Sequence, residues 1–227
     1  MDESPLLEAR ALGIERAGRE LFKSLDLRVS AGDIVHLRGT NGAGKTTLLR
    51  ILAGLSRFGF EGQVERSSAV LFLGHQSAVK SLLTPRENLR LHPSGERFCD
   101  EVAIDRALEN VGLYGYEDVP AGQLSAGQQR RVNLARLYLT GRELWLLDEP
   151  FTAIDVQGVA RLQARFLEHA RGGGAIVLTS HQALDLDYPV RMLDLVPAAF
   201  RDGAFRDSAP RAVASRTVVS RTSEGHA

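Results

Sequence analysis

Residues 39–47, GTNGAGKTT, combine at a fixed spacing the residue types that bind phosphate chains. Glycines such as Gly39 and Gly44 let the backbone amides wrap around an anion, Lys45 can reach the terminal phosphate oxygens, and the Thr46 hydroxyl can bind Mg²⁺. A chance match to this pattern is roughly a one-in-a-hundred event for an average composition. The alternative is a glycine-rich turn beside a surface lysine. We favour a nucleotide site, formed by Gly39, Thr40, Asn41, Gly42, Ala43, Gly44, Lys45, Thr46 and Thr47.

A second group of chemically capable residues follows the apolar run LWLL at 144–147. The run is typical of a buried strand, and it ends in Asp148 and Glu149. An aspartate in this position of a phosphate-loop enzyme binds Mg²⁺, and the adjacent carboxylate can orient or activate a water molecule. Two solvated acids at a strand end would be the structural alternative.

Gln76 and His181 each follow another apolar run, AVLFLG (69–74) and AIVLTS (175–180). The carboxyl ends of parallel strands meet at one edge of a sheet, where ligands bind. We therefore expect Gln76 to bind Mg²⁺ or its water, and His181 to donate a hydrogen bond to a terminal phosphate. A purely structural role is the alternative for each of them.

The stretch LSAGQQRR (124–131) predicts a carefully capped helix that contains a destabilising residue. Ser125 can cap the first turn, and Gln128 can reach back to complete a capping box. Gly127 nevertheless lies in that turn, where glycine costs about 1 kcal/mol relative to alanine. Exposed amides at a helix N-terminus attract anions, so we expect an anion site here as well.

These residues must be positioned by an α/β fold. Apolar runs at 33–38, 69–74, 144–150, 175–180 and 190–196 predict strands, and KTTLLRILAGL (45–55) and residues 156–174 predict helices. Between Gln76 and the LSAGQ motif, PRENLRLH (85–92) and CDEVAIDRALENVGL (99–113) read as two amphipathic helices with no strand between them. This pattern indicates a helical lobe inserted into the core. We expect a flexible tail after about residue 205.

Composition narrows the range of functions. The 227-residue chain has a formal net charge of zero, which argues against nucleic acid as a partner. A single cysteine, Cys99, excludes an internal disulfide and a zinc site that needs two cysteines of this chain. The start MDESPLLEARAL does not read as a secretory signal, and no apolar run reaches the ~18–20 residues that span a bilayer. Any role at a membrane would then require a partner chain.

The phosphate loop, Gln76, LSAGQ, LLDE, TAID and His181 follow one another as in the ATP-binding cassette (ABC) ATPases, which this chain resembles over about residues 6–200. The resemblance implies a P-loop NTPase with a RecA-like core, an antiparallel β subdomain and a helical subdomain at about 77–142, all within an ATP-binding domain of residues 1–205, with 206–227 as the tail. It implies ATP and Mg²⁺ as cofactors, with Thr46, Gln76 and Asp148 at the metal. Glu149, His181 and Lys45 would be catalytic.

The same resemblance implies a head-to-tail dimer, with this chain or a paralogous ATPase as the second subunit. Ser125, Gly127 and Gln128 would then face the nucleotide bound by the other copy, and Asp155 of TAID would connect the two sites. Two departures stand out. Ala126 occupies a position where the family usually has glycine. The family usually stacks adenine on an aromatic residue before the second strand, but GIERAGRELF (13–22) has no aromatic residue until Phe22. Arg16 could stack through its guanidinium plane instead.

Within the family, GHQSAVK (74–80) and FTAID (151–155) are similar to the haem-exporter ATP-binding subunits of bacterial cytochrome c maturation. This resemblance implies an integral membrane transporter subunit as partner, met by the segment that holds His75 and Lys80. Haem would be involved only indirectly, and the chain would lie peripherally on the cytoplasmic face of the bacterial inner membrane.

Four other functions remain to be compared, the first of which is the ATPase of another ABC transporter. An ATP-driven release factor for a membrane haem complex, without transport, would share every motif with the export ATPase. A DNA-repair or ribosome-associated ABC protein is disfavoured by the neutral charge and the single cassette. A nucleotide switch without hydrolysis is disfavoured by the presence of Glu149.

Overall fold

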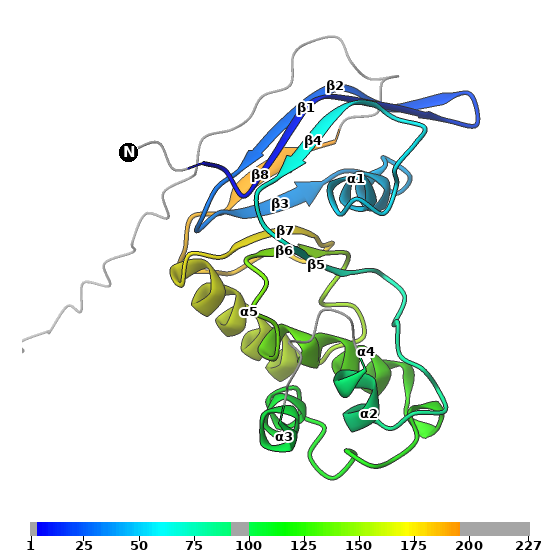
Figure 1. Ribbon diagram of the computed structural model, residues 1–227, viewed down its shortest axis with the longest axis vertical. Helices are drawn as coiled ribbons and strands as arrows, with labels where there is room; N and C mark the ends of the chain where they lie inside the picture. The colour runs from blue at the N-terminus through cyan, green and yellow to red at the C-terminus, as the bar shows by residue number, and fades with distance from the viewer. Residues whose placement is uncertain (1–3, 92–99, 196–227) are drawn as a thin grey trace, which may run out of the picture.

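Two β-sheets enclose the helix that follows the phosphate loop. The computed structural model describes residues 4–91 and 100–195. The smaller sheet has the order β2-β1-β4 and is antiparallel throughout; its strands are β1 (Leu7–Arg16), β2 (Arg19–Val29) and β4 (Glu61–Arg66). Figure 1 shows this sheet on one side of α1 (Lys45–Leu52) and the larger sheet on the other.

The larger sheet is parallel and carries the chemistry. Its strand order is β5-β6-β7-β3-β8, with β3 at Ile34–Arg38, β5 at Val70–Leu73, β6 at Leu144–Leu147, β7 at Ala175–Thr179 and β8 at Arg191–Asp194. Every residue of β6 and β7 is buried, because helices or the second sheet cover both faces. The strands expected from the apolar runs are therefore present, and their carboxyl ends share one edge.

Two apolar cores lie on the two faces of this sheet. On one face, Leu48, Leu49 and Leu52 of α1 pack between the parallel strands and the antiparallel sheet. On the other face lies α5 (Val156–Arg171), whose buried Leu162, Phe166 and Ala170 recur every fourth residue. This spacing places them on one side of the helix, towards the sheet.

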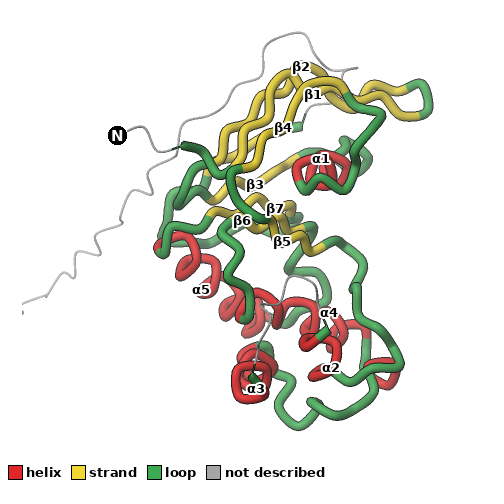
Figure 2. The backbone as a smooth tube through the Cα atoms, viewed as in Figure 1, coloured by secondary structure: helices red, strands yellow, loops and turns green. Residues whose placement is uncertain are grey.

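A helical lobe is inserted between β5 and β6, as the sequence predicts. It contains α2 (Pro85–Arg90), α3 (Glu101–Asn110), α4 (Ala126–Ala135) and the short 3₁₀ turns Ala121–Gln123 and Arg136–Tyr138. The lobe has its own apolar core, which includes Leu89, Ile104, Leu108 and Val132. Figure 2 shows it as a group of helices below the parallel strands.

The expected fold class is confirmed, including the antiparallel subdomain that only the family resemblance implied. Helix α1 ends at Leu52, earlier than its apolar pattern indicates. The Arg66 guanidinium of β4 donates to the carbonyls of Ile51 and Leu52 and thereby satisfies the end of the helix. Among the described residues, no helix is long and apolar enough to cross a membrane. The tail predicted for residues 206–227 lies outside the described residues.

A histidine packs flat against the chain's one tryptophan at the far end of α5. The rings of His169 and Trp145 are 3.6 Å apart and inclined by 8°. His169 Nε2–H donates to the Glu143 carbonyl at 3.0 Å. A Cβ at Gly174 would come within 2.2 Å of the imidazole, so only glycine fits there. Burial lowers the pKa of His169 from 6.5 to about 4.

This histidine predicts an acid-dependent loss of stability. The unfolded chain takes up the His169 proton below its ordinary pKa of 6.5, whereas the folded chain resists it until about 4, so the free energy of unfolding falls as pH falls through that interval. Urea unfolding at pH 7.5 and 5 should show a smaller loss in His169→Gln than in the unchanged chain. Equal losses in the two proteins would contradict this assignment.

Candidate functional site

The phosphate loop delivers an open helix N-terminus to the edge of the parallel sheet. Gly44 is the N-cap residue of α1, and no side chain accepts a hydrogen bond from the first-turn amides. The first turn contains no acidic residue. The positive end of the helix dipole is therefore available to an anion.

Gly44 is required by both backbone conformation and space. Its φ of 98° lies in the left-handed region, which residues with a Cβ rarely adopt. A Cβ would also lie 3.2–3.3 Å from atoms of Leu21 and Phe22 in β2. The antiparallel sheet therefore packs closely against the phosphate loop and restricts its conformation.

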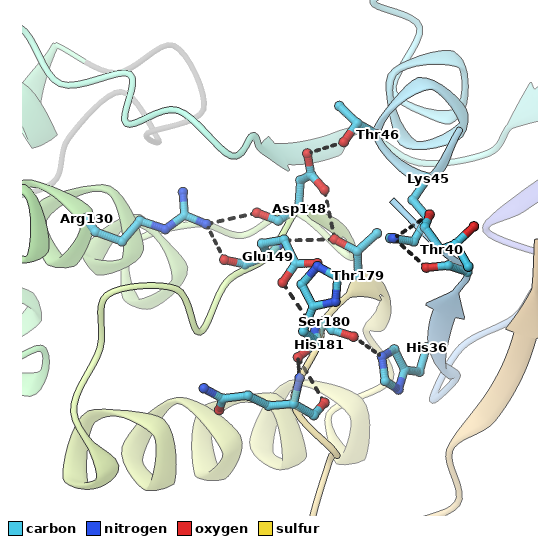
Figure 3. Close-up of polar contacts among 12 residues, drawn as sticks. His36, Thr40, Lys45, Thr46, Arg130, Asp148, Glu149, Thr179, Ser180 and His181 are labelled. Carbon is cyan, nitrogen blue, oxygen red and sulfur yellow. Dashed lines mark hydrogen bonds and ion pairs between the residues drawn. The ribbon is translucent and has the colours of Figure 1, made fainter. Parts of the chain in front are cut away.

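Lys45 and Thr46 begin α1 and point towards the strand ends. Lys45 Nζ donates to the carbonyl of Gly39 at 2.7 Å, which keeps the ammonium group over the loop (Figure 3). The Thr46 hydroxyl donates to Asp148 Oδ2 at 2.8 Å. The phosphate-loop motif and the LLDE motif, a hundred residues apart in sequence, therefore meet directly.

Asp148 is held from two sides by hydroxyl groups. Its second oxygen, Oδ1, accepts a hydrogen bond from Thr179 Oγ1 at 2.8 Å, so α1, β6 and β7 are joined through one carboxylate. The residue is only 2% exposed. A hydroxyl and a carboxylate oxygen side by side are hard ligands of the kind that Mg²⁺ uses.

Glu149 adopts a strained backbone conformation. Its φ is 50°, which costs a residue with a side chain about 1–2 kcal/mol. Its amide donates to Thr179 Oγ1 at 2.8 Å. One nitrogen of the Arg130 guanidinium donates to its carbonyl at 2.8 Å and to that of Asp148 at 2.9 Å (Figure 3). These contacts compensate for the strain and aim the side chain at the pocket.

The two oxygens of the Glu149 carboxylate have different surroundings. Oε2 accepts a hydrogen bond from the backbone amide of His181 at 3.3 Å. Oε1 is buried and accepts no hydrogen bond from any residue that the structure describes, although His181 Nε2 lies 3.5 Å from it. A buried carboxylate oxygen without a donor is a group ready to accept a proton from water.

His181 is positioned from behind by His36, a residue of β3 that the sequence analysis did not single out. His36 Nε2–H donates to the Ser180 carbonyl at 3.1 Å. Burial lowers the pKa of His36, so the neutral imidazole that makes this contact is favoured. The loop after β7 is thus tied to the strand that precedes the phosphate loop.

A pocket of about 330 Å³ collects most of the predicted site. It is lined by Leu21, Asn41, Gly42, Gly44, Lys45, Thr46, Thr47, His75, Asp148, Glu149 and His181. Gln76 lines a neighbouring groove of about 620 Å³, which it shares with Thr46 and Asp148. Gln76 is therefore near the expected metal ligands, although it faces the space between the core and the helical lobe.

The LSAGQ residues lie elsewhere on the chain. Ser125 Oγ accepts from the Gln128 amide at 3.2 Å and Gln128 Oε1 accepts from the Ser125 amide at 2.9 Å, so the predicted capping box is present. Neither residue lines the pocket of their own chain. Steric crowding also favours glycine at position 127, because a Cβ there would lie 3.0 Å from the Ala153 carbonyl.

Asp155 connects the TAID segment to α4. Its side chain caps α5 by accepting from the Gly158 amide at 2.9 Å, and it pairs with Arg131 at 3.0 Å. The hydrogen bond from Gly158 is the main cause of its lowered pKa. Within one chain, Asp155 therefore acts as a helix cap and an α4–α5 link.

Three residues that the sequence analysis missed complete the site: Thr179, Arg130 and His36. Thr179 could have been found, because it is a hydroxyl residue at the end of the strand that leads to His181. Nothing in the sequence indicated a role for Arg130 in the site, because arginine in a polar helix segment normally faces solvent. His36 lies within an apolar strand, so the sequence pattern did not distinguish it from the core residues around it.

The sequence and the fold agree with those of known proteins. Residues 22–152 match the ABC transporter family. Proteins called "Cytochrome c biogenesis ATP-binding export protein CcmA" are similar to this chain: the one from Yersinia pestis bv. Antiqua is 53% identical over 79% of this chain and 87% of its own length. The one from Hahella chejuensis is 48% identical over 85% and 97%.

Solved structures share the same fold. A dimeric ATP-binding cassette in a post-hydrolysis state, bound to ADP and phosphate, has a TM-score of 0.72 and 22% identity, covering 83% of this chain and 93% of that chain. An ABC transporter ATP-binding protein from Pyrococcus furiosus has a TM-score of 0.70 and 25% identity, covering 83% and 96%. By sequence, fold and site geometry, this chain belongs to the ABC transporter family of ATP-binding subunits, together with the CcmA cytochrome c biogenesis ATP-binding export proteins.

Proposed function

We propose that this chain is the ATP-hydrolysing subunit of a membrane ABC complex that serves haem delivery in cytochrome c biogenesis. The observation that carries the proposal is the meeting of Thr46, Asp148 and Glu149 at the end of one sheet, beside an open helix N-terminus. These groups match the requirements of a magnesium nucleotide and of water activation. The names of the relatives supply the link to cytochrome c biogenesis.

Each group has a distinct part in hydrolysis. The amides of the phosphate loop and Lys45 would bind the phosphate chain, and Thr46, Asp148 and Gln76 would hold Mg²⁺, which supplies charge neutralisation at the reacting phosphate. Glu149 accepts a proton from the attacking water through its free Oε1. His181 lies beside Glu149 and can donate a hydrogen bond to the terminal phosphate.

The position of the LSAGQ motif supports a head-to-tail dimer. Ser125 and Gly127 begin α4 at a distance from their own phosphate pocket, so they do not complete it within the chain. A second ATPase subunit, rotated to face this one, brings that helix end against the nucleotide that Lys45 binds. Each pocket is then completed by the other subunit, and ATP joins the two.

The same geometry supports coupling to a membrane partner. The groove that Gln76 lines lies between the core and the helical lobe, the two parts that carry the two halves of the nucleotide site. An integral membrane subunit that contacts this region, including His75 and Lys80, would respond to dimer closure. In this arrangement the chain is peripheral, on the cytoplasmic face of the inner membrane, and haem is handled by its partners.

An ATP-driven release factor for a membrane haem complex remains the second candidate, because it would use the same site. The two functions differ in whether haem crosses the membrane. Haem uptake into sealed inverted vesicles that contain the complex would distinguish them: ATP-dependent accumulation supports transport, and release of a membrane-bound haem complex without accumulation supports the second candidate.

Lys45→Ala should abolish nucleotide binding without unfolding the chain, because the ammonium group serves the phosphates and its contacts within the chain are to loop carbonyls. Equilibrium binding of a fluorescent ATP analogue measures the effect, and circular dichroism checks the fold. Lys23→Ala, a change of another exposed lysine, is the control and should bind normally. Binding at the unchanged affinity in Lys45→Ala would refute the site.

Selectivity for the base should be modest, because no aromatic residue occupies positions 13–21. We expect ATP and GTP to be hydrolysed with values of kcat/KM within about tenfold, a difference of about 1.4 kcal/mol. Steady-state kinetics with both nucleotides provides the measurement. A larger preference for ATP would reveal an adenine contact elsewhere in the chain.

Glu149→Gln should bind ATP and Mg²⁺ but lose hydrolysis by about 10²–10⁴-fold, because an amide cannot accept the proton of the attacking water. The closed dimer should then persist. Analytical ultracentrifugation at high protein concentration should show dimers with ATP and monomers with ADP. Monomers under both conditions would argue against the proposed dimer.

Adding Ser125→Arg to Glu149→Gln should remove the dimer, because a bulky side chain enters the contact with the other subunit's phosphate. Each monomer should still bind ATP through Lys45 and Thr46. Ser125→Ala is the matched control: it loses only the helix cap, at a cost of about 1 kcal/mol in stability. If Ser125→Arg abolished ATP binding by the monomer, LSAGQ would serve its own chain's nucleotide.

A further inference from the structure

Arg130 is a buried cation whose contacts join three functional segments. It lies in the middle of α4 and is only 4% exposed. Its Nη1 donates to the carbonyl of Gly74 at 2.7 Å. Its Nη2 donates to the carbonyls of Asp148 and Glu149 at 2.9 and 2.8 Å. The ends of β5 and β6 are thus held by one side chain of the helical lobe.

The contacts of Arg130, a buried charge, are to backbone carbonyls. Burial lowers its pKa, and the charges of Asp148 and Glu149 oppose that shift without forming ion pairs with it. A planar guanidinium can serve two strand ends at once, whereas an ammonium group acts as a point charge. The geometry therefore uses the shape of arginine as well as its charge.

The two carbonyls at Asp148 and Glu149 converge on one nitrogen because the chain turns sharply at Glu149. That turn is the left-handed conformation with a φ of 50°. Thr179 binds the amide of the same residue at 2.8 Å from the opposite side (Figure 3). The peptide that carries the base is therefore fixed by a strand on one side and by α4 on the other.

The N-terminus of α4 is the helix end that the proposed dimer places against a nucleotide. Ser125 caps it, and about one and a half turns separate that cap from Arg130 at roughly 3.6 residues per turn. Ser77 Oγ also donates to the Gln129 carbonyl at 3.1 Å, so the segment that contains Gln76 follows the same helix. Movement of α4 has a direct path of hydrogen bonds to Glu149.

We propose that Arg130 is a positioning residue that fixes the backbone of Glu149 and makes the competence of this base depend on how α4 is seated. The proposal rests on the proposed function, since α4 is seated by the nucleotide of the second subunit. ATP bound in one pocket thereby controls the position of Glu149, the proposed general base, in the other pocket. Two binding sites that share a rigid, hydrogen-bonded element are coupled in this way.

Arg130→Met should lower kcat for ATP at least tenfold and leave KM within about threefold, because the phosphate loop is untouched. The kcat of Arg130→Lys should lie between those of Arg130→Met and the unchanged chain, because lysine keeps the charge but can serve only one strand end. Arg165→Met is the matched control: Arg165 also donates to a backbone carbonyl, that of Leu137, but it lies on α5 over the Trp145 ring and, within the described part of the chain, forms no hydrogen bond or ion pair with Asp148 or Glu149. It should keep kcat within twofold. Turnover is measured on the full chain in membranes that contain its partner subunits.

A double-mutant cycle with Glu149→Gln separates positioning from general support of the fold. If Arg130 acts through the carboxylate, Arg130→Met should not lower the residual single-turnover rate of Glu149→Gln further. An equal loss in both backgrounds would overturn the proposal. A kcat of Arg130→Met within twofold of the unchanged chain would overturn it as well.

Hydrogen exchange tests the coupling without relying on activity. In Glu149→Gln, closure of the dimer by ATP should slow amide exchange in residues 148–152, and the double variant with Arg130→Met should lose this protection while it still forms the ATP-dependent dimer. Protection that survives the loss of Arg130 would refute the coupling. A Glu149→Gln chain that never dimerises would instead refute the proposed function, so the two failures are distinguishable.

Discussion

The carboxylate of Asp148 is the contact on which the site depends. It accepts one hydrogen bond from Thr46 and one from Thr179, each at 2.8 Å, and it is almost completely buried. Through these two bonds, the phosphate loop, the strand that carries the acids and the strand that leads to His181 are held in one register. Burying this charge is costly unless its oxygens are hydrogen-bonded, so the two bonds that stabilise the Asp148 carboxylate also assemble the site.

The ends of two helices show how the nucleotide site is divided. Helix α1 begins at Gly44 without a side-chain cap, which leaves its amides to a ligand in the same chain. Helix α4 is capped by Ser125 and Gln128 and begins away from that ligand. A capped helix end is stable on its own, so α4 would keep its shape until, in the proposed dimer, a second subunit brings a phosphate to it. This difference agrees with ATP as the element that joins two subunits.

The strained backbone at Glu149 gives the side chain of this proposed catalytic residue its direction. The left-handed backbone turns the carboxylate towards the pocket, where Oε1 stays buried without a donor. Arg130 and Thr179 maintain this conformation from two different parts of the fold. Contacts that reach into the helical lobe offset the cost of the strain, and we propose that the lobe influences hydrolysis through them.

The class of the fold, the parallel strands and the phosphate loop could all be predicted from the sequence alone. These features are local: apolar runs, glycine spacing and capping residues act within a few positions of one another. The sequence also indicated that Ser125 and Gly127 belong to an anion site. The roles of Arg130, Thr179 and His36 were decided only by the tertiary structure, because each acts through a backbone group far away in the chain. Backbone carbonyls and amides are the same at every position, so no residue pattern announces which of them a buried side chain will bind.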